Sequence, residues 1–266
     1  MRRAGRIVLS LLAAGVVYLF YIYLTLPDVR RLRTDNPKTT AFIELRAREA
    51  RRNGRVPKRD QRWVRYDRIS ANLKRAVLVA EDSAFWQHEG VDVEQLRESI
   101  EENLEKGTFA RGGSTITQQL AKNLYLSPSK NPARKLREFF IARRLEAELS
   151  KRRILELYMN VIEWGDGIYG AEAAARTYFR EPASAIGPDE SALLAGAIIN
   201  PRLYNPAHPN ARLHRRQRLI LGRMGAVTPP SGETAPAPAE PLPMSPPAAI
   251  EPSPSEPPVP PGTPGS

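Results

Sequence analysis

The chain has 266 residues, with 40 Lys and Arg, 29 Asp and Glu, and no cysteine, which gives a formal net charge of +11. This length bounds the chain to one or two domains. The absence of cysteine excludes a disulfide framework, which a domain of this size does not need in order to bury a core. The positive excess favours an anionic partner, such as a phospholipid surface, a nucleic acid or a phosphorylated substrate.

An uncharged run, IVLSLLAAGVVYLFYIYLTL, occupies residues 7–26. A helix of this length spans roughly 30 Å, which matches the core of a bilayer. A cleaved signal peptide usually has a shorter apolar region of about 7–15 residues and a small-residue cleavage site. We therefore predict a retained transmembrane helix. Arginines stand on both sides of the run, so the positive-inside rule leaves its orientation open. A long domain after a single anchor usually crosses the membrane, so we expect residues 1–6 in the cytoplasm.

The opposite end of the chain is rich in proline. Residues 228–266 hold 15 of the 25 prolines, four glutamates and neither lysine nor arginine. Proline at this density cannot maintain helices or sheet ladders, so we predict a disordered tail. An inert spacer is the favoured interpretation, and a ligand for a proline-recognition domain is the alternative. Removing the charge of −4 on the tail leaves +15 on the rest of the chain.

The middle of the chain, from about residue 40 to 225, has helical periodicity. The segment 40–52 is either a basic amphipathic helix on anionic lipid or a solvated linker helix. Asn131-Pro132 provides a cap residue and a first-turn proline for a helix that continues to residue 150. No alternating strand pattern is found, so we predict an all-α core. The other expected helices cover residues 69–86, 93–106, 151–161, 171–178 and 189–199.

The segment EDSAFWQHEG, residues 81–90, places two carboxylates and a histidine in apolar surroundings. On the expected helix Glu81 shares a face with Phe85, whereas Asp82 points about 100° away. An acidic pair on a helix is usually solvated, but a carboxylate in an apolar wall gains affinity for protons and can act as a base. His88 alone is more often structural. The following residues lack the HExxH spacing, so we predict no metal held by the protein.

The segment RGGSTITQQLAKN, residues 111–123, combines a glycine pair with the start of a helix. The glycines permit close approach of a ligand, and Thr115 to Gln118 matches a capping box. A helix N-terminus followed by Lys122 favours an anion. A plain capped helix explains Thr115, but not the polar side chains that crowd the next turns. Those side chains are Gln118, Gln119, Lys122 and Asn123.

Two further motifs follow, RKLRE at 134–138 and KRRILELYMNVIEWG at 151–165. Arg134 and Glu138 are four residues apart and share a helix face. This spacing usually gives a surface ion pair of little energetic value. The alternative is a clamp, in which Arg134 holds a phosphate and Glu138 is a second carboxylate across a cleft from Glu81.

Together these four motifs resemble the peptidoglycan glycosyltransferases of family 51, and most closely the monofunctional biosynthetic transglycosylases. The family patterns EDxxFxxHxG, GxSTxxQQ, RKxxE and KxxILExYxN all occur in order, and the similarity runs from about Leu26 to Pro206. The resemblance implies a lysozyme-like helical domain, which we place at 61–227 after a juxtamembrane segment at 27–60. It also implies a periplasmic location at the inner membrane and lipid II as substrate. Other partners would be the growing glycan, membrane lipid and cell-wall synthesis proteins.

The resemblance also implies roles for individual residues. Glu81 would deprotonate the 4-hydroxyl of the acceptor sugar, which attacks the anomeric carbon of the donor as undecaprenyl diphosphate leaves. An α-linked donor and a β-1,4 product require a single inverting displacement, and Glu138 would lie near the leaving group. No organic cofactor is implied, and a divalent cation (Mg²⁺ or Mn²⁺) bridging the diphosphate is compatible with the chemistry. The residues expected to bind substrate or shape its pocket are Asp82, Phe85, His88, Ser114, Thr115, Gln118, Gln119, Lys122, Asn123, Arg134 and Lys135.

Two other classes of protein are alternatives to the glycosyltransferase. A lysozyme-like peptidoglycan hydrolase would share the fold and the catalytic glutamate, but it needs neither a diphosphate clamp nor a permanent anchor. A tethered nucleic-acid-binding protein would use the positive charge. However, the basic residues alternate with glutamates and no aromatic stacking platform is evident, so we expect no nucleic acid as partner.

Overall fold

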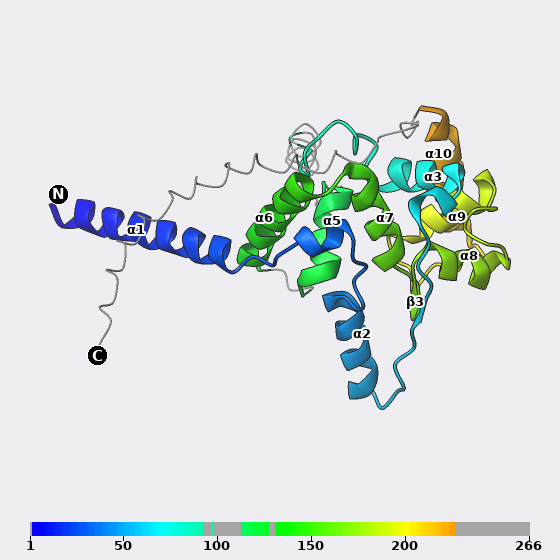
Figure 1. Ribbon diagram of the computed structural model, residues 1–266, viewed down its shortest axis with the longest axis horizontal. Helices are drawn as coiled ribbons and strands as arrows, with labels where there is room; N and C mark the ends of the chain where they lie inside the picture. The colour runs from blue at the N-terminus through cyan, green and yellow to red at the C-terminus, as the bar shows by residue number, and fades with distance from the viewer. Residues whose placement is uncertain (1, 93–96, 98–112, 128–130, 227–266) are drawn as a thin grey trace, which may run out of the picture. The chain divides into compact units, whose positions relative to one another are not determined.

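A computed structural model describes residues 2–92, 97, 113–127 and 131–226 of the chain, and most of these residues are helical (Figure 1). The expected helix at 93–106 and the proline-rich tail lie outside the described residues. The helices before residue 113 are α1 (Arg2–Leu24), α2 (Ala41–Arg52) and α3 (Ala71–Glu81). Those that follow are α5 (Ile116–Tyr125), α6 (Pro132–Glu148), α7 (Lys151–Val161), α8 (Ala171–Phe179), α9 (Pro188–Ala197) and α10 (Ala211–Arg223). Short 3-10 turns lie at Arg30–Arg33, Tyr66–Arg68 and Met224–Ala226.

Side-chain caps set the first residue of several helices. The expected cap at Asn131 is confirmed, because its side chain accepts a hydrogen bond from the backbone N–H of Ala133 and Pro132 follows at the first helical position. Helix α10, capped by Asn210, was not expected from the sequence. Its segment is dominated by arginine, and only Leu213 and Ile220 are buried within it, so the apolar stripe is too narrow to stand out.

Helix α1 covers most of the uncharged run at the start of the chain. Most of its apolar side chains face outward, for example Leu11, which is 68% exposed, and Val17, which is 67% exposed, whereas Ile22 near its end is buried. Within the described residues, no helix is both long and apolar enough to cross a membrane. The transmembrane helix expected from the sequence therefore stays a prediction.

A small three-stranded sheet corrects the expectation of an all-α core. Its strands are β1 (Asp60–Gln61), β2 (Glu163–Gly165) and β3 (Ile168–Tyr169). They lie in the order β1-β3-β2, with β1 parallel and β2 antiparallel to β3. Strands of two or three residues are too short to show alternation. The sequence does contain one indication of the hairpin, the pair Asp166-Gly167, because Asp-Gly is typical of hairpin turns. In the structure this pair connects β2 to β3, and Gly167 has a φ of +78°.

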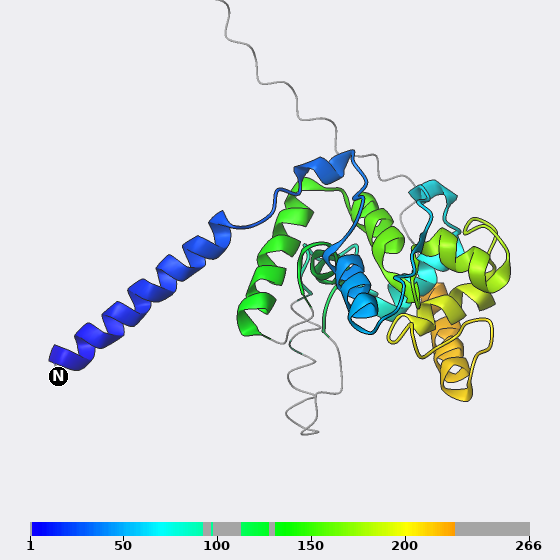
Figure 2. The same cartoon turned by 90° about the horizontal axis from the view of Figure 1, so that it is seen from below.

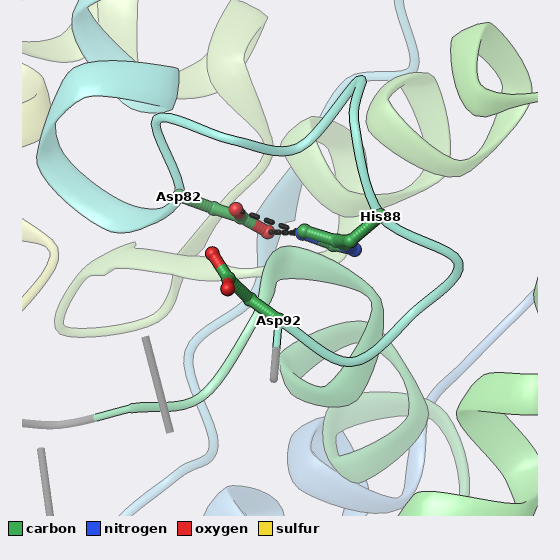
Figure 3. Close-up of side chains that lie close together, drawn as sticks. All are labelled: Asp82, His88 and Asp92. Carbon is green, nitrogen blue, oxygen red and sulfur yellow. Dashed lines mark hydrogen bonds and ion pairs between the residues drawn. The ribbon is translucent and has the colours of Figure 1, made fainter. Parts of the chain in front are cut away.

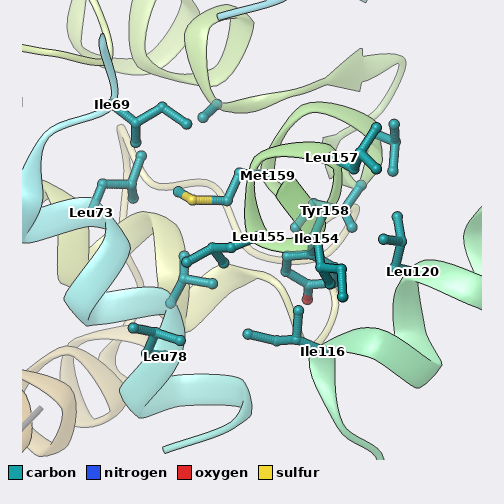
Figure 4. Packing of buried hydrophobic residues seen from close by; sticks show 14 of the residues in the cluster. Ile69, Leu73, Leu78, Ile116, Leu120, Ile154, Leu155, Leu157, Tyr158 and Met159 are labelled. Atoms are coloured by element: carbon teal, nitrogen blue, oxygen red, sulfur yellow. The ribbon is translucent and has the colours of Figure 1, made fainter. Parts of the chain in front are cut away.

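Helix α7 lies in the middle of the hydrophobic core. In Figure 4, Leu73 and Leu78 of α3 face Leu155 and Met159 of α7, while α5 approaches α7 near Tyr158. All of these side chains are fully buried. The packing fixes the end of α3 and the start of α5 on two sides of one helix, and these two ends carry the first two motifs.

Helix α2 packs against this domain and is not a solvated linker helix, while contact of its exposed face with lipid stays a prediction. Ile43 is only 4% exposed, and α2 contacts α5 (Figure 2). Arg46 on the same helix donates hydrogen bonds to Glu163 of β2. The apolar residues of α2 thus pack against protein, which a single sequence cannot distinguish from packing against lipid.

Candidate active site

The first motif begins at the last residue of α3. The helix ends at Glu81, and Asp82 has an extended conformation with φ −167°. The expectation of one helix through residue 86 is therefore wrong, and Glu81 and Phe85 do not share a helical face. Phe85 is fully buried, with Lys151 Nζ 4.5 Å from the centroid of its ring. The structure thus places Phe85 in the core beneath the motif.

Asp82 is the centre of a buried hydrogen-bond network (Figure 3). His88 Nε2 lies 3.0 and 3.1 Å from the two carboxylate oxygens of Asp82. The backbone N–H of Gly90 donates to His88 Nδ1 at 3.1 Å, so Nδ1 carries no proton and the ring donates from Nε2. Asp82 Oδ2 also accepts the backbone N–H of Ile116 at 2.9 Å. The network therefore ties the loop after α3 to the first turn of α5.

A third carboxylate approaches this pair, because ligand atoms of Asp82, His88 and Asp92 all lie within 4.8 Å of one another (Figure 3). The hydrogen bonds above occupy both oxygens of Asp82 and both nitrogens of His88. A metal ion at this point would have to displace those bonds, so the cluster does not fit a metal ion. Mg²⁺ is usually bound through substrate phosphates and waters in any case.

The capping box expected at the second motif is present. Thr115 Oγ1 accepts the N–H of Gln118 at 3.2 Å, and Gln118 Oε1 accepts the N–H of Thr115 at 3.3 Å. The Thr115 hydroxyl donates in turn to the carbonyl of Gly90 at 2.7 Å. Since Asp82 takes the N–H of Ile116, side chains of the protein already fill much of the anion site expected at this helix N-terminus. Thr115 and Gln118 are buried and contribute to the fold of the site.

Gln119 connects the first motif to the fourth. Its Nε2 donates a 2.8 Å hydrogen bond to Glu81 Oε2, and its Oε1 accepts the hydroxyl of Tyr158 at 3.0 Å. Asn123 Nδ2 donates to the Gln119 carbonyl at 2.8 Å and so supports the same turn of α5. Tyr158 is fully buried and was not singled out from the sequence, where an aromatic residue in an apolar helix looks like ordinary core.

Burial raises the pKa of the Glu81 carboxyl above its ordinary value, while the hydrogen bond from Gln119 and the charges of Arg216 and Lys122 oppose that rise. Arg216 was also missed by the sequence analysis, because it lies on the unexpected helix α10. Its Nε donates to the Gly196 carbonyl at 2.9 Å, which anchors the guanidinium to α9. A carboxylate with a raised pKa and a fixed hydrogen bond is suited to accept a proton.

A second charged cluster lies on α6. Glu138 accepts a 2.6 Å hydrogen bond from Arg134 Nη1 and a 2.5 Å hydrogen bond from Lys135 Nζ. The Glu138 side chain is only 3% exposed, so this is not the surface ion pair considered above. Lys135 also donates to Ser114 Oγ at 3.0 Å, which links α6 to the segment before α5. The structure therefore joins the second and third motifs through Lys135, which also pairs with the buried Glu138.

Lys122 lies within the electrostatic reach of both carboxylates. Burial lowers the pKa of its ammonium group, Glu138 and Glu81 raise that pKa, and Arg134 and Lys135 lower it. Within the described part of the chain, the side-chain ammonium group of Lys122 makes no hydrogen bond or ion pair. A partly buried cation with unused donors is well suited to bind an anionic group of a ligand.

A cavity of about 260 Å³, called here the α5 cleft, opens beside these residues. It is lined by Gln119, Lys122 and Asn123 of α5, by Tyr158 of α7, and by Arg46 and Glu163. The cleft therefore brings Gln119, the hydrogen-bond partner of Glu81, and the partly buried Lys122 to one surface. Of the residues expected at the site, five do not line this cleft: Asp82, Phe85, His88, Thr115 and Gln118. They take part in the hydrogen-bond network or the core described above.

The chain belongs to the transglycosylase family, whose pattern it matches over residues 49–225. The resemblance noted from the four motifs is thereby confirmed.

Curated relatives of the chain are similar to it over most of their own length. The chain is 49% identical over 230 residues to the biosynthetic peptidoglycan transglycosylase of Aromatoleum aromaticum, a match that covers 86% of this chain and 98% of the relative. A protein of the same name from Nitrosospira multiformis is 44% identical over 225 residues, covering 85% and 96%. One from Nitrosomonas eutropha is 47% identical over 219 residues, covering 82% and 88%.

Proposed function

We propose that this chain polymerises lipid II into β-1,4 glycan strands by inverting displacement of undecaprenyl diphosphate. Its relatives are named biosynthetic peptidoglycan transglycosylases, so the chain is a peptidoglycan glycosyltransferase of cell-wall synthesis. One observation carries the finer proposal: Gln119 of α5 donates a hydrogen bond to a carboxylate of raised pKa, Glu81 at the end of α3, and α5 also carries the partly buried cation Lys122. A proton acceptor and a phosphate-binding cation are the two groups that this displacement requires.

The step proceeds in one displacement. Glu81 takes the proton of the acceptor 4-hydroxyl as that oxygen forms a bond to the anomeric carbon of the donor. The bond from that carbon to the diphosphate breaks on the opposite side, and the electron pair leaves with the diphosphate. Because the leaving group is an anion, it needs positive charge more than a proton, and Lys122 and Arg134 supply that charge.

Glu138 is better suited to organise the cations than to act as the base. Both of its oxygens already accept hydrogen bonds from cations, Arg134 and Lys135. A carboxylate with both oxygens held by cations has neither oxygen placed to face the hydroxyl of a substrate. Glu81 has an amide as its hydrogen-bond partner and lacks this direct ionic pairing in the described residues.

We also propose that α1 anchors the enzyme in the cytoplasmic membrane, with residues 61–227 on the periplasmic side. The uncharged run at 7–26 and the exposed apolar side chains of α1 support this proposal. The end of the run is bound to the domain, because Arg137 donates to Thr25 Oγ1 at 2.8 Å and Arg144 donates to the Leu26 carbonyl at 3.3 Å. An anchor joined in this way would hold the site near a lipid-linked substrate.

The test is to incubate the full chain, solubilised in detergent, with lipid II and to measure the size of the glycan. Wild type should form polymer, and Glu81→Gln should form it about 10²–10⁴-fold more slowly, since that is the usual contribution of a general base. The matched control is Glu89→Gln, which changes an 81% exposed carboxylate in the same motif. If Glu81→Gln polymerises normally and Glu138→Gln is inactive, the base is Glu138. Soluble muropeptides released from cell wall would instead indicate the lysozyme-like hydrolase.

A further inference from the structure

A second and larger cavity, of about 440 Å³, lies between α2 and the β2–β3 hairpin. We call it the α2–hairpin pocket. Its lining includes Arg46 and Arg55 from the α2 side and Glu163 and Asp166 from the hairpin side. Its volume is in the usual range of small-molecule sites, about 300–1,000 Å³. None of the site residues that we predicted from the four motifs lines this pocket. The displacement reaction itself therefore does not account for the presence of the pocket.

The α2–hairpin pocket and the α5 cleft share one wall. Arg46 and Glu163 line both cavities. Arg46 donates to Glu163 Oε2 through Nε at 3.1 Å and through Nη2 at 2.9 Å, and the Glu163 side chain is only 3% exposed. A ligand held in the α5 cleft therefore needs to pass a single buried ion pair to enter the second pocket.

The second pocket is built rather than formed by chance between mobile side chains. The backbone N–H of Asp60 donates to the Gly167 carbonyl at 2.8 Å, which joins β1 to the hairpin turn. On the other wall, Arg46 Nη1 donates to Glu49 Oε2 at 2.9 Å. The two walls are joined to each other by the Arg46–Glu163 hydrogen bonds.

The charges of the pocket leave one cation in excess. Its lining carries four cations, Arg46, Arg55, Lys58 and Arg202, and three carboxylates, Glu49, Glu163 and Asp166. Asp166 is 3.0 Å from Arg202 Nη2 and 3.5 Å from Lys58 Nζ. The guanidinium of Arg55 makes no hydrogen bond or ion pair with any residue that the structure describes. The pocket thus offers a guanidinium to a ligand that carries a carboxylate.

We propose that the α2–hairpin pocket binds the short, carboxylate-bearing peptide carried by the sugar of the substrate in the α5 cleft, with Arg55 as the cation that recognises a carboxylate. The proposal rests on the proposed function, because it assumes a saccharide with a peptide branch. An extended peptide of five residues reaches about 17 Å, which is enough to span two cavities that share a wall.

The test compares two synthetic substrates with the full chain in detergent: lipid II with its whole peptide, and the same lipid-linked disaccharide without the peptide. Arg55→Glu should raise the KM for the peptide-bearing substrate about tenfold, as expected for one charge-assisted contact, and leave kcat unchanged. The KM for the peptide-free substrate should not change. Arg52→Glu is the matched control, because it reverses the charge of an exposed arginine of α2 outside the pocket and should affect neither substrate.

A second variant predicts a change in the opposite direction. Asp166→Asn releases Lys58 and Arg202 from their common carboxylate and preserves the turn, since Asn-Gly suits a hairpin as well as Asp-Gly does. It should lower the KM for the peptide-bearing substrate alone. Equal effects of Arg55→Glu on both substrates, or no effect on either, would overturn the pocket proposal alone. If wild type polymerises neither substrate, the proposed function falls, and this proposal falls with it.

Discussion

The side-chain amide of Gln119 donates a 2.8 Å hydrogen bond to the carboxylate of Glu81. The orientation of that amide is fixed from its other end, because the Tyr158 hydroxyl lies 3.0 Å from Gln119 Oε1 and donates to it. Tyr158 of the fourth motif thus sets which end of the Gln119 side chain faces the Glu81 carboxylate. Through this hydrogen bond the fourth motif contacts the site, although Tyr158 itself is buried in the core.

The hydrogen bond makes a prediction about pH dependence. Gln119 lowers the pKa of Glu81 against the larger raising effect of burial. Gln119→Met removes the donor and should raise that pKa further. The acid limb of kcat/KM should then move to higher pH, because Glu81 must be ionised to accept a proton. Gln119→Glu should move it further still, since two adjacent carboxylates share a proton. The measurement is the rate of lipid II polymerisation across pH.

The same pH series for Arg216→Met provides an independent comparison. Arg216 lowers the pKa of Glu81 through its charge, so its loss should shift the acid limb in the same direction as Gln119→Met. Arg216→Lys keeps the charge and should restore most of the wild-type profile. Acid limbs that coincide in all four variants and wild type would show that Glu81 is not the group that titrates in the reaction.

Asp82 and His88 give a prediction about stability. In Asp82→Asn the new amide can still accept the N–H of Ile116, but its NH₂ group then faces the Nε2–H of His88. The histidine cannot switch tautomer without placing Nδ1–H against the N–H of Gly90. We expect about 1–3 kcal/mol less free energy of unfolding, the usual effect of an unsatisfied buried polar group. Urea unfolding checks this value, and an unchanged midpoint would contradict the network.

The cluster on α6 predicts different results for its two partners. Arg134→Ala should reduce turnover by about 10²-fold, as loss of an electrostatic stabiliser commonly does, and Arg134→Lys should recover only part because it lacks the planar fork. Glu138→Gln should reduce stability as well, because it leaves Arg134 and Lys135 without their common carboxylate. In Arg134→Ala the turnover should fall much more than the urea midpoint does. In Glu138→Gln both the turnover and the urea midpoint should fall.

Local signals in the sequence were sufficient for the helix starts of the site. The Thr115–Gln118 capping box and the Asn131-Pro132 start were predicted, because each depends on side chains within three residues of the cap. The structure brings residues of the quoted motifs near one another, since Glu81 bonds to Gln119, Glu138 bonds to Arg134, and Lys122 lies within electrostatic reach of both carboxylates.

What could not be predicted depends on contacts between distant segments. The sequence pattern continues past Glu81, but α3 ends there because Asp82 bonds to His88 and to the start of α5. Arg216 comes from a helix whose apolar stripe is too narrow to detect, and it reaches the site only through packing of α10 on α9. Both features require the tertiary structure.

Lys122 gives the last prediction, in which activity and stability should change in opposite directions. Burial lowers the pKa of this ammonium group, so the folded state holds its proton less tightly than the unfolded state does. Its charge is therefore unfavourable for folding at every pH below the lowered pKa. Lys122→Met should raise the urea midpoint at neutral pH while reducing glycan synthesis by about 10²-fold or more, since the diphosphate loses a partly desolvated cation.

The sign of the effect can be checked by pH. The stability advantage of Lys122→Met should be greatest at neutral pH and should shrink as pH rises through the lowered pKa toward about 10.4, the unfolded value for lysine. Lys122→Arg keeps the charge and should not show this advantage. If Lys122→Met is less stable than wild type at neutral pH, the ammonium group must be favourably paired in the folded enzyme. Lys122 would then be a structural cation instead of one kept available for the substrate.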